Sequence, residues 1–123
     1  PGARHRRGVV YRSRSKFDAA IADLSEAIRL SPESAVVRLD RGIARSSKGD
    51  YAGAIDDYSE AIRLDPGLAP AWWNRAVVRE RKGDRDGAIA DLRKVIELTK
   101  PGTRFQSDAR ERVRTLETPA VTD

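Results

Sequence analysis

The chain has 123 residues, of which 35% are charged, and its net charge at pH 7 is +5. This length fits a single domain that buries roughly two-thirds of the surface of its unfolded chain. Cysteine is absent, which excludes disulfides and thiolate metal sites, and no apolar run approaches the length of a membrane span or of a signal-peptide core.

A repeat with a period of 34 residues runs through most of the chain. The stretch SEAIRLSP at residues 25–32 returns as SEAIRLDP at residues 59–66. The same period also aligns small residues, aliphatic residues and one aspartate per copy. Three gapless copies therefore follow one another, at residues 1–34, 35–68 and 69–102, which is typical of stacked structural repeats.

Each copy is predicted to form two antiparallel helices. Its apolar residues recur every three or four positions, which places them on one face of a helix. Gly49 with Asp50, and Gly83 with Asp84, are typical of a helix C-terminus followed by the N-cap of the next helix. With one further helix after the last copy, the expected helices span residues 2–14, 17–30, 34–48, 51–64, 69–82, 85–98 and 104–117.

The segment after the third copy is expected to cap the array. Phe105, Ala109, Val113 and Leu116 share one face of a helix because they are three or four residues apart. Most other positions of this segment are charged, so the helix is apolar toward the last repeat and charged outward, as a repeat array requires for solubility. Residues 118–123 are expected to be a disordered tail.

The pattern resembles the tetratricopeptide repeat. A unit of that family has an aromatic residue, a Leu-Gly pair and a Tyr in its first helix, then an Ala, an aromatic residue and a Pro. The matching residues here are Gly8, Tyr11, Ala20, Leu24, Pro32, Gly42, Ala54, Tyr58, Pro66, Trp72, Ala88 and Leu92. The resemblance implies an all-α fold, a right-handed α-solenoid of three helix-turn-helix repeats. Together with the C-terminal capping helix it forms one domain over residues 1–117.

Arginine departs from the family pattern in two columns of the repeat. It replaces the Leu at positions 7, 41 and 75, and the Tyr at positions 45 and 79. An aspartate column on the second helix is equally regular, and an Arg that faces its partner helix needs a counter-charge. We therefore expect one ion pair in each copy, the alternative being two separately solvated columns. The expected pairs are Arg7–Asp23, Arg41–Asp57 and Arg75–Asp91.

The sequence lacks the residues of the common catalytic sites. His5 is the one histidine and cysteine is absent, so a nucleophile–histidine site would depend on His5. No HExxH, Walker or GxGxxG motif occurs. Asp56 and Asp57 point about 100° apart on a helix, so they do not readily share a proton or a metal. The sequence therefore predicts no enzyme, no metal site and no cofactor.

The resemblance implies a protein–protein interaction module. The first helix of each repeat lines the concave face of such an array, and in the family this groove receives a peptide or a segment of a partner. The residues expected to line the groove are His5, Arg6, Val9, Arg12, Val36, Leu39, Asp40, Ile43, Ser47, Pro70, Trp73, Asn74, Val77, Glu80 and Arg81.

Two adjacent tryptophans are expected to have different roles, because neighbours on a helix cannot face the same way. Trp72 matches the buried aromatic residue of the family and is assigned to packing. Trp73 then turns toward the groove as a ligand contact, or else lies over neighbouring first-helix side chains. We expect the ligand to have an apolar anchor near Trp73, Leu39 and Val77, and acidic residues toward the basic first repeat.

Two other functions stay open. One is self-association through the first repeat, which has no cap before it. The other is binding of RNA or another polyanion by the basic segment 4–16. It is disfavoured because charge elsewhere is spread, and because base stacking requires an exposed aromatic residue whereas Tyr11 is expected in the core. Chaperone-tail carboxylates, which some family members clamp, are disfavoured because the matching residues are unsuitable: His5, Val9, Asp40, Pro70 and Asn74.

Methionine is absent from the chain, and the first repeat begins at residue 1. We therefore interpret the chain as part of a longer protein. Its compartment stays unassigned, with the cytoplasm favoured.

Overall fold

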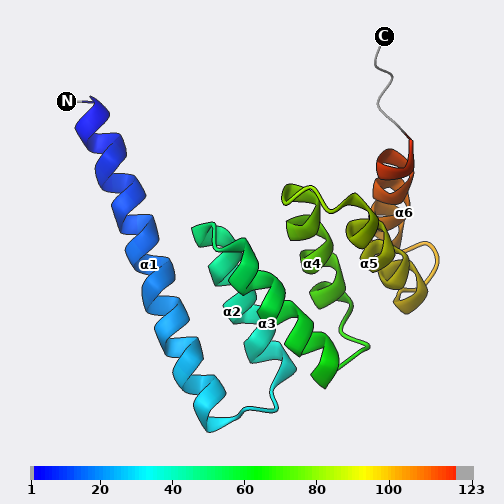
Figure 1. Cartoon of the computed structure of the whole chain (residues 1–123), viewed down its shortest axis with the longest axis horizontal. Coiled ribbons are helices and arrows are strands. Elements are labelled where there is room, and N and C mark those ends of the chain that lie inside the picture. Colours follow the sequence, from blue (N-terminus) through cyan, green and yellow to red (C-terminus); the bar gives the residue numbers. More distant parts are fainter. Residues whose placement is uncertain (1, 119–123) are drawn as a thin grey trace.

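The computed structural model describes the backbone of residues 2–118 and side chains from residue 14 onward. Within this range the chain forms six helices and no strand, which confirms the all-α helical repeat. The helices are arranged in chain order from α1 at one end of the structure to α6 at the other (Figure 1). None of those described is long and apolar enough to cross a membrane. They are α1 (Gly2–Leu30), α2 (Ala35–Lys48), α3 (Tyr51–Leu64), α4 (Ala69–Arg81), α5 (Arg85–Leu98) and α6 (Arg104–Glu117).

The first repeat differs from the expectation, because one continuous helix, α1, replaces the two helices predicted there. The later turns contain a glycine with positive φ, as at Gly49 with φ 95°, followed by a capping aspartate, as at Asp50, which accepts a hydrogen bond from the next helix. The first copy has Ser15 and Lys16 at these positions. Neither residue favours positive φ nor supplies such a cap, so nothing ends the helix.

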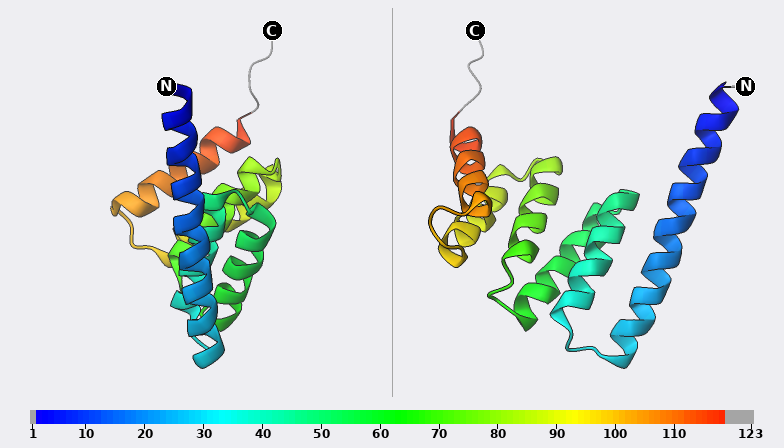
Figure 2. Two further views of the ribbon diagram at one scale, coloured as in Figure 1. Left: turned by 90° about the vertical axis from the view of Figure 1, so that its left-hand side faces the viewer. Right: turned by 180° about the vertical axis from the view of Figure 1, so that it is seen from behind.

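The N-terminal half of α1 extends past the end of α2 (Figures 1 and 2). Lys48, the last residue of α2, lies level with Asp18, because its ammonium is 2.5 Å from that carboxylate. Residues 2–14 therefore have no antiparallel partner helix within the described part of the chain. The bounds of the other five helices agree with the expectation to within one residue. Of the expected tail, residues 119–123 lie outside the described residues, and Thr118 is the C-cap of α6.

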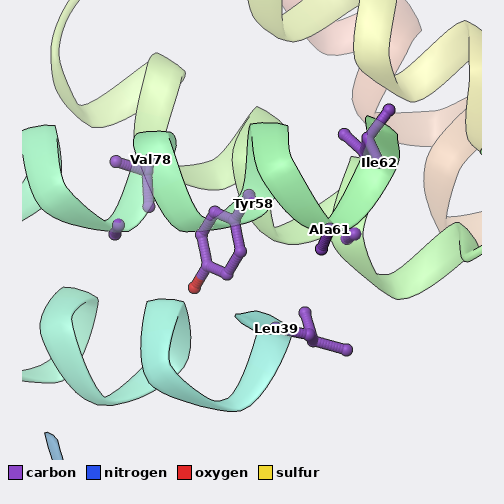
Figure 3. Close-up of a cluster of buried hydrophobic side chains, with 7 residues drawn as sticks. Leu39, Tyr58, Ala61, Ile62 and Val78 are labelled. Atoms are coloured by element: carbon purple, nitrogen blue, oxygen red, sulfur yellow. The ribbon is translucent and has the colours of Figure 1, made fainter. Parts of the chain in front are cut away.

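The first core cluster joins α2, α3 and α4 (Figure 3). Tyr58 lies at its centre and is almost fully buried, with Leu39, Ala61 and Val78 in the same cluster. A Cβ added at Gly42 would lie 2.5 Å from the ring of Tyr58. The glycine therefore lets the backbone of α2 come close to the ring of Tyr58 on α3, which explains why this column of the repeat holds small residues.

The second core cluster joins α4, α5 and α6, and it confirms that α6 caps the array. Ala109 and Val113 of α6 are buried against Ala76 and Leu92. Phe105 and Leu116 are half-buried at the edge of the same cluster. All seven charged residues of α6 are exposed: Arg104, Asp108, Arg110, Glu111, Arg112, Arg114 and Glu117. The last helix is thus apolar on one side and charged on the other, as the spacing predicts.

Candidate functional site

A buried ion cluster connects the two helices of the second repeat. Arg41 donates to Asp57 from Nε (2.9 Å) and from Nη2 (2.7 Å), and Arg45 donates from Nη1 (3.0 Å). Arg41 also donates to the hydroxyl of Ser25 in α1 (3.1 Å). The predicted Arg41–Asp57 pair is confirmed, and the second arginine of the cluster is a feature that the sequence did not reveal.

The third repeat contains the same cluster one period later. Arg75 and Arg79 both bind Asp91, and Arg75 also reaches Ser59. The predicted Arg75–Asp91 pair is therefore confirmed as well. The third predicted pair involves Arg7, whose side chain lies outside the described residues. These clusters fix each first helix on its second helix and on the preceding repeat, so they orient the surface that the first helices present.

The inner face of the array consists of the exposed sides of α2, α4 and α6. α2 contacts α4 directly, whereas α3 and α5 make no comparable contact in the described part of the chain. The first helices thus lie closer together than the second helices, which places them on the inside of the curve. α6 continues this side, because Arg112 Nε donates to Glu80 of α4 (3.0 Å) and Phe105 packs on Trp73.

The predicted groove residues of α2 are placed as follows. Val36 and Ile43 are unusually exposed for aliphatic residues, at 55% and 42%. Asp40 and Ser47 are also exposed on the same side of α2. Leu39 is only 8% exposed and belongs to the first core cluster, so its assignment to the groove is wrong. Its side chain fills the space beside Tyr58, where a peptide cannot reach it.

The predicted groove residues of α4 all keep some exposed surface. Pro70 and Arg81 are exposed, while the others are half-buried: Trp73, Asn74, Val77 and Glu80. Val77, Glu80 and Arg81 line a hollow of about 360 Å³ together with Arg112 of α6. The groove residues predicted in the first repeat, His5, Arg6, Val9 and Arg12, have side chains outside the described residues.

α6 contributes inner-face residues that the sequence analysis missed. Asp108, Glu111, Arg112 and Thr115 line a hollow of about 260 Å³ with Trp73 of α4. These positions were interpreted only as the outward charged side of a cap. The repeat period carried the missing signal, since Asp108 lies 34 residues after Asn74 and Glu111 lies 34 residues after Val77. α6 therefore acts as a fourth first helix as well as a cap.

Trp72 and Trp73 have the different surroundings that the sequence predicts. Trp72 packs between the two core clusters, donates from Nε1 to the carbonyl of Pro66 (2.9 Å), and lies 5.1 Å from the guanidinium of Arg75. Trp73 turns toward α6, where its ring centre is 5.4 Å from that of Phe105. It lies over a neighbouring helix, as the alternative proposed, and also lines a hollow that is open to solvent.

The hollows between α4 and α6 are lined by three acidic residues, Glu80, Asp108 and Glu111, and by two basic residues, Arg81 and Arg112. Asp108 and Glu111 are both exposed there, and among the described side chains Asp108 has only a long contact of 4.0 Å, with the exposed Arg104. Arg112 is engaged by Glu80, and Arg81 donates to the hydroxyl of Tyr51 (3.2 Å). No group of three or more metal-ligating side chains occurs among the residues described. The arrangement offers apolar surface and carboxylates, which suits recognition of a polypeptide.

Comparison with protein families and solved structures agrees with this architecture. The sequence profile of the tetratricopeptide repeat matches residues 5–69 and 39–102. A comparison with curated protein sequences gives no match. A similar solved structure is the tetratricopeptide-repeat domain of Arabidopsis OM64, with 24% identity, 88% of each chain covered and a TM-score of 0.74.

Two other similar structures contain bound peptides. The second tetratricopeptide-repeat domain of human RPAP3, in complex with the HSP70 peptide SGPTIEEVD, is 24% identical, with 89% of this chain and 91% of that chain covered and a TM-score of 0.72. The type III secretion chaperone SycD of Yersinia enterocolitica, in complex with a peptide of the translocator YopD, is 21% identical, with 89% and 84% covered and a TM-score of 0.73. At these identities the similarity shows a common fold.

Proposed function

The chain belongs to the tetratricopeptide-repeat family, and we propose that it binds a segment of a partner protein along its inner face. The observation that carries this proposal is the hollow between α4 and α6, where the half-buried ring of Trp73 lies next to exposed carboxylates. Large aromatic residues that keep accessible surface are frequent anchors of protein interfaces. The bound peptides of the RPAP3 and SycD structures support the same role for this fold.

The inner face favours a ligand with an apolar anchor and a basic residue. The apolar anchor fits beside Val77 and Ile43, which offer aliphatic surface on adjacent first helices. A Lys or Arg side chain fits the hollow at Trp73, because a cation there faces the aromatic ring and the carboxylates of Asp108 and Glu111. Arg112 lines the same hollow, but its guanidinium is bound to Glu80. Acidic ligand residues toward the basic first repeat remain a prediction that depends on side chains before residue 14.

An acidic chaperone tail is a poor ligand for this surface. A tail such as SGPTIEEVD brings a terminal carboxylate, two Glu side chains and one Asp side chain to a face that carries Asp40, Asp108 and Glu111. Like charges at an interface reduce both affinity and the rate of association. We expect no binding of SGPTIEEVD by isothermal titration calorimetry up to about 1 mM peptide, and micromolar binding would contradict the proposed ligand chemistry.

The proposal is tested by selecting peptides from a random phage-displayed library and measuring their affinity for matched variants. Glu111→Lys changes the inner face, and Glu97→Lys makes the same charge change on the exposed side of α5. Ile43→Ser is likewise matched by Leu98→Ser, since both residues are exposed aliphatic side chains. We expect each inner-face variant to weaken binding about tenfold, or ~1.4 kcal/mol, and each α5 variant to leave it unchanged. Equal effects on the two faces, or failure to select any peptide, would contradict the proposal.

A further inference from the structure

The second half of α1 lacks the cover that its counterparts have. Asp57 and Asp91 are 2% and 1% exposed, whereas Asp23, at the same position of the first repeat, is exposed. The first repeat is also less buried at the next position, which holds a Leu or an aromatic residue: Tyr58 and Leu92 are buried, whereas Leu24 is half-buried. The same difference in burial is found at the alanine position, where Ala54 and Ala88 are fully buried and Ala20 is half-buried. One face of residues 17–30 is therefore uncovered in the described structure.

Residues 2–14 have the sequence of the first helix that would cover this face. In the second and third repeats the cover is the first helix of the same repeat, and its core-facing columns hold Gly42 and Ala76, Ala44 and Val78, and Val37 and Ala71. The first repeat keeps each of these columns small or apolar, with Gly8, Val10 and Ala3. It also keeps the arginine that would bind the aspartate, at Arg7.

A continuous α1 prevents these residues from reaching their own second helix. Arg7 and Asp23 are 16 residues apart in one helix, which corresponds to about 24 Å along its axis at 1.5 Å per residue. Arg41 and Asp57 have the same separation in the sequence, yet their side chains are in contact because a turn lies between them. The cover and the face that it fits are therefore both present, but on opposite halves of one straight helix.

We propose that two copies of the chain exchange these segments, so that residues 2–14 of each copy pack on residues 17–30 of the other. The two α1 helices would run antiparallel and cross near residue 15, which is midway between Arg7 and Asp23 in the sequence. Each crossing would rebuild one complete first repeat, with Arg7 of one copy on Asp23 of the other. Exchange of an identical element across a hinge that cannot turn back is a common route to dimers.

The charge distribution of α1 favours a second copy in this antiparallel arrangement. Residues 1–16 contain several basic residues and no acidic residue, whereas residues 17–30 contain Asp18, Asp23 and Glu26 with one Arg. An antiparallel pair places the basic half of each α1 against the acidic half of the other. A parallel pair would place like charges together, at a cost in affinity.

The hinge provides the first test. By light scattering after size-exclusion chromatography, from about 1 µM to about 1 mM protein, the wild-type chain is expected to form a dimer. Ser15→Gly with Lys16→Asp copies the turn of the second repeat, so this double variant is expected to fold back and be monomeric. Ser15→Ala with Lys16→Ala keeps the helix and serves as the matched control, which is expected to remain dimeric. A wild-type chain that is monomeric over this range, or a Gly-Asp variant that remains dimeric, would overturn the proposal.

Charge reversal provides a second test, which distinguishes exchange from any other dimer. Arg7→Asp and Asp23→Arg are each expected to weaken the homodimer by roughly 100-fold or more, because each places two like-charged pairs in the interface. An equimolar mixture of the two variants restores both ion pairs, but only between chains, so heterodimers are expected at the wild-type affinity. A dimer that neither variant weakens, or a mixture that stays monomeric, would show that residues 2–14 are not exchanged.

Discussion

The buried ion cluster of the second repeat provides the sharpest test of the fold. In Asp57→Asn the side chain keeps its shape but loses the charge that two arginines bind through three hydrogen bonds of 2.7–3.0 Å. The side chain of Asp57 is 3% exposed and that of Arg41 is 15% exposed, so water replaces little of what is lost. Breaking a buried pair from one side costs about 3–5 kcal/mol. We expect about 3 kcal/mol, because Arg45 is 25% exposed and can turn toward solvent.

The assay is urea unfolding followed by circular dichroism at 222 nm. Asp56→Asn, on the adjacent exposed residue, is the control and is expected to change the free energy of unfolding by less than about 0.5 kcal/mol. A double-mutant cycle of Asp57→Asn with Arg41→Met isolates the pair, and we expect a coupling energy of about 2 kcal/mol. A coupling energy close to zero would refute the conclusion that this pair holds the two helices of the repeat together.

Three further predictions follow from the packing. Gly42→Ala is expected to lower the free energy of unfolding by about 1–2 kcal/mol, because the added Cβ meets the ring of Tyr58. Adding Tyr58→Leu should relieve the clash, since it recreates the Ala–Leu pair of the third repeat. A chemical denaturation series in which Gly42→Ala is stabilising would contradict this. Burial raises the pKa of Tyr58 to about 12, above its unfolded value of 10.0. The unfolded state therefore loses this proton first, and the free energy of unfolding falls between pH 10 and 12 by up to roughly 2 kcal/mol. Thermal melts of Tyr58→Phe should lack this decline, and an equal decline in both proteins would contradict this role of Tyr58. Trp72→Ala is expected to lower the free energy of unfolding, measured in urea, by about 3 kcal/mol, because Trp72 packs on both core clusters. Trp73→Ala is expected to lower it less, and the reverse order would show that the two roles are exchanged.

The sequence predicted those parts of the fold that depend on regular columns. The 34-residue period located α2 to α5 to within one residue, and the apolar spacing of residues 105–116 located α6. Four of these five helices begin at a residue whose side chain caps them locally: Ser34, Asp50, Asp84 and Thr103. The period also predicted the Arg41–Asp57 and Arg75–Asp91 pairs, since a buried arginine needs a carboxylate and the aspartate column is the regular one available.

The same regularity caused the main error, which concerns α1. The first copy was assigned the turn of the other copies although Ser15 and Lys16 replace the glycine and the aspartate that make it. The composition of the turn decided the outcome, and the signal was present in the sequence. The second arginine at each aspartate, Arg45 or Arg79, was missed because its reach depends on the tilt between two helices.

The candidate site was predicted less completely than the fold. Helical periodicity gives the direction of a side chain but not how deeply its neighbours cover it, so Leu39 was placed in the groove although it packs beside Tyr58. The contribution of α6 was missed because a charged helix face was interpreted only as a solvated end of the array. Whether such a face also lines a hollow depends on how α6 tilts against α4, and the sequence does not specify this angle.

The most direct test of binding at the inner face is a two-dimensional proton–nitrogen NMR spectrum of the chain with and without a selected peptide. The two tryptophans give separate indole N–H signals, one from Trp72, which donates to Pro66, and one from Trp73 in the hollow between α4 and α6. Binding at the inner face predicts that the Trp73 signal shifts together with the amides of Ile43 and Val77, while the Trp72 signal and the amides of α3 and α5 stay in place. A peptide that shifts α3 and α5 and leaves the Trp73 signal unchanged would contradict the account.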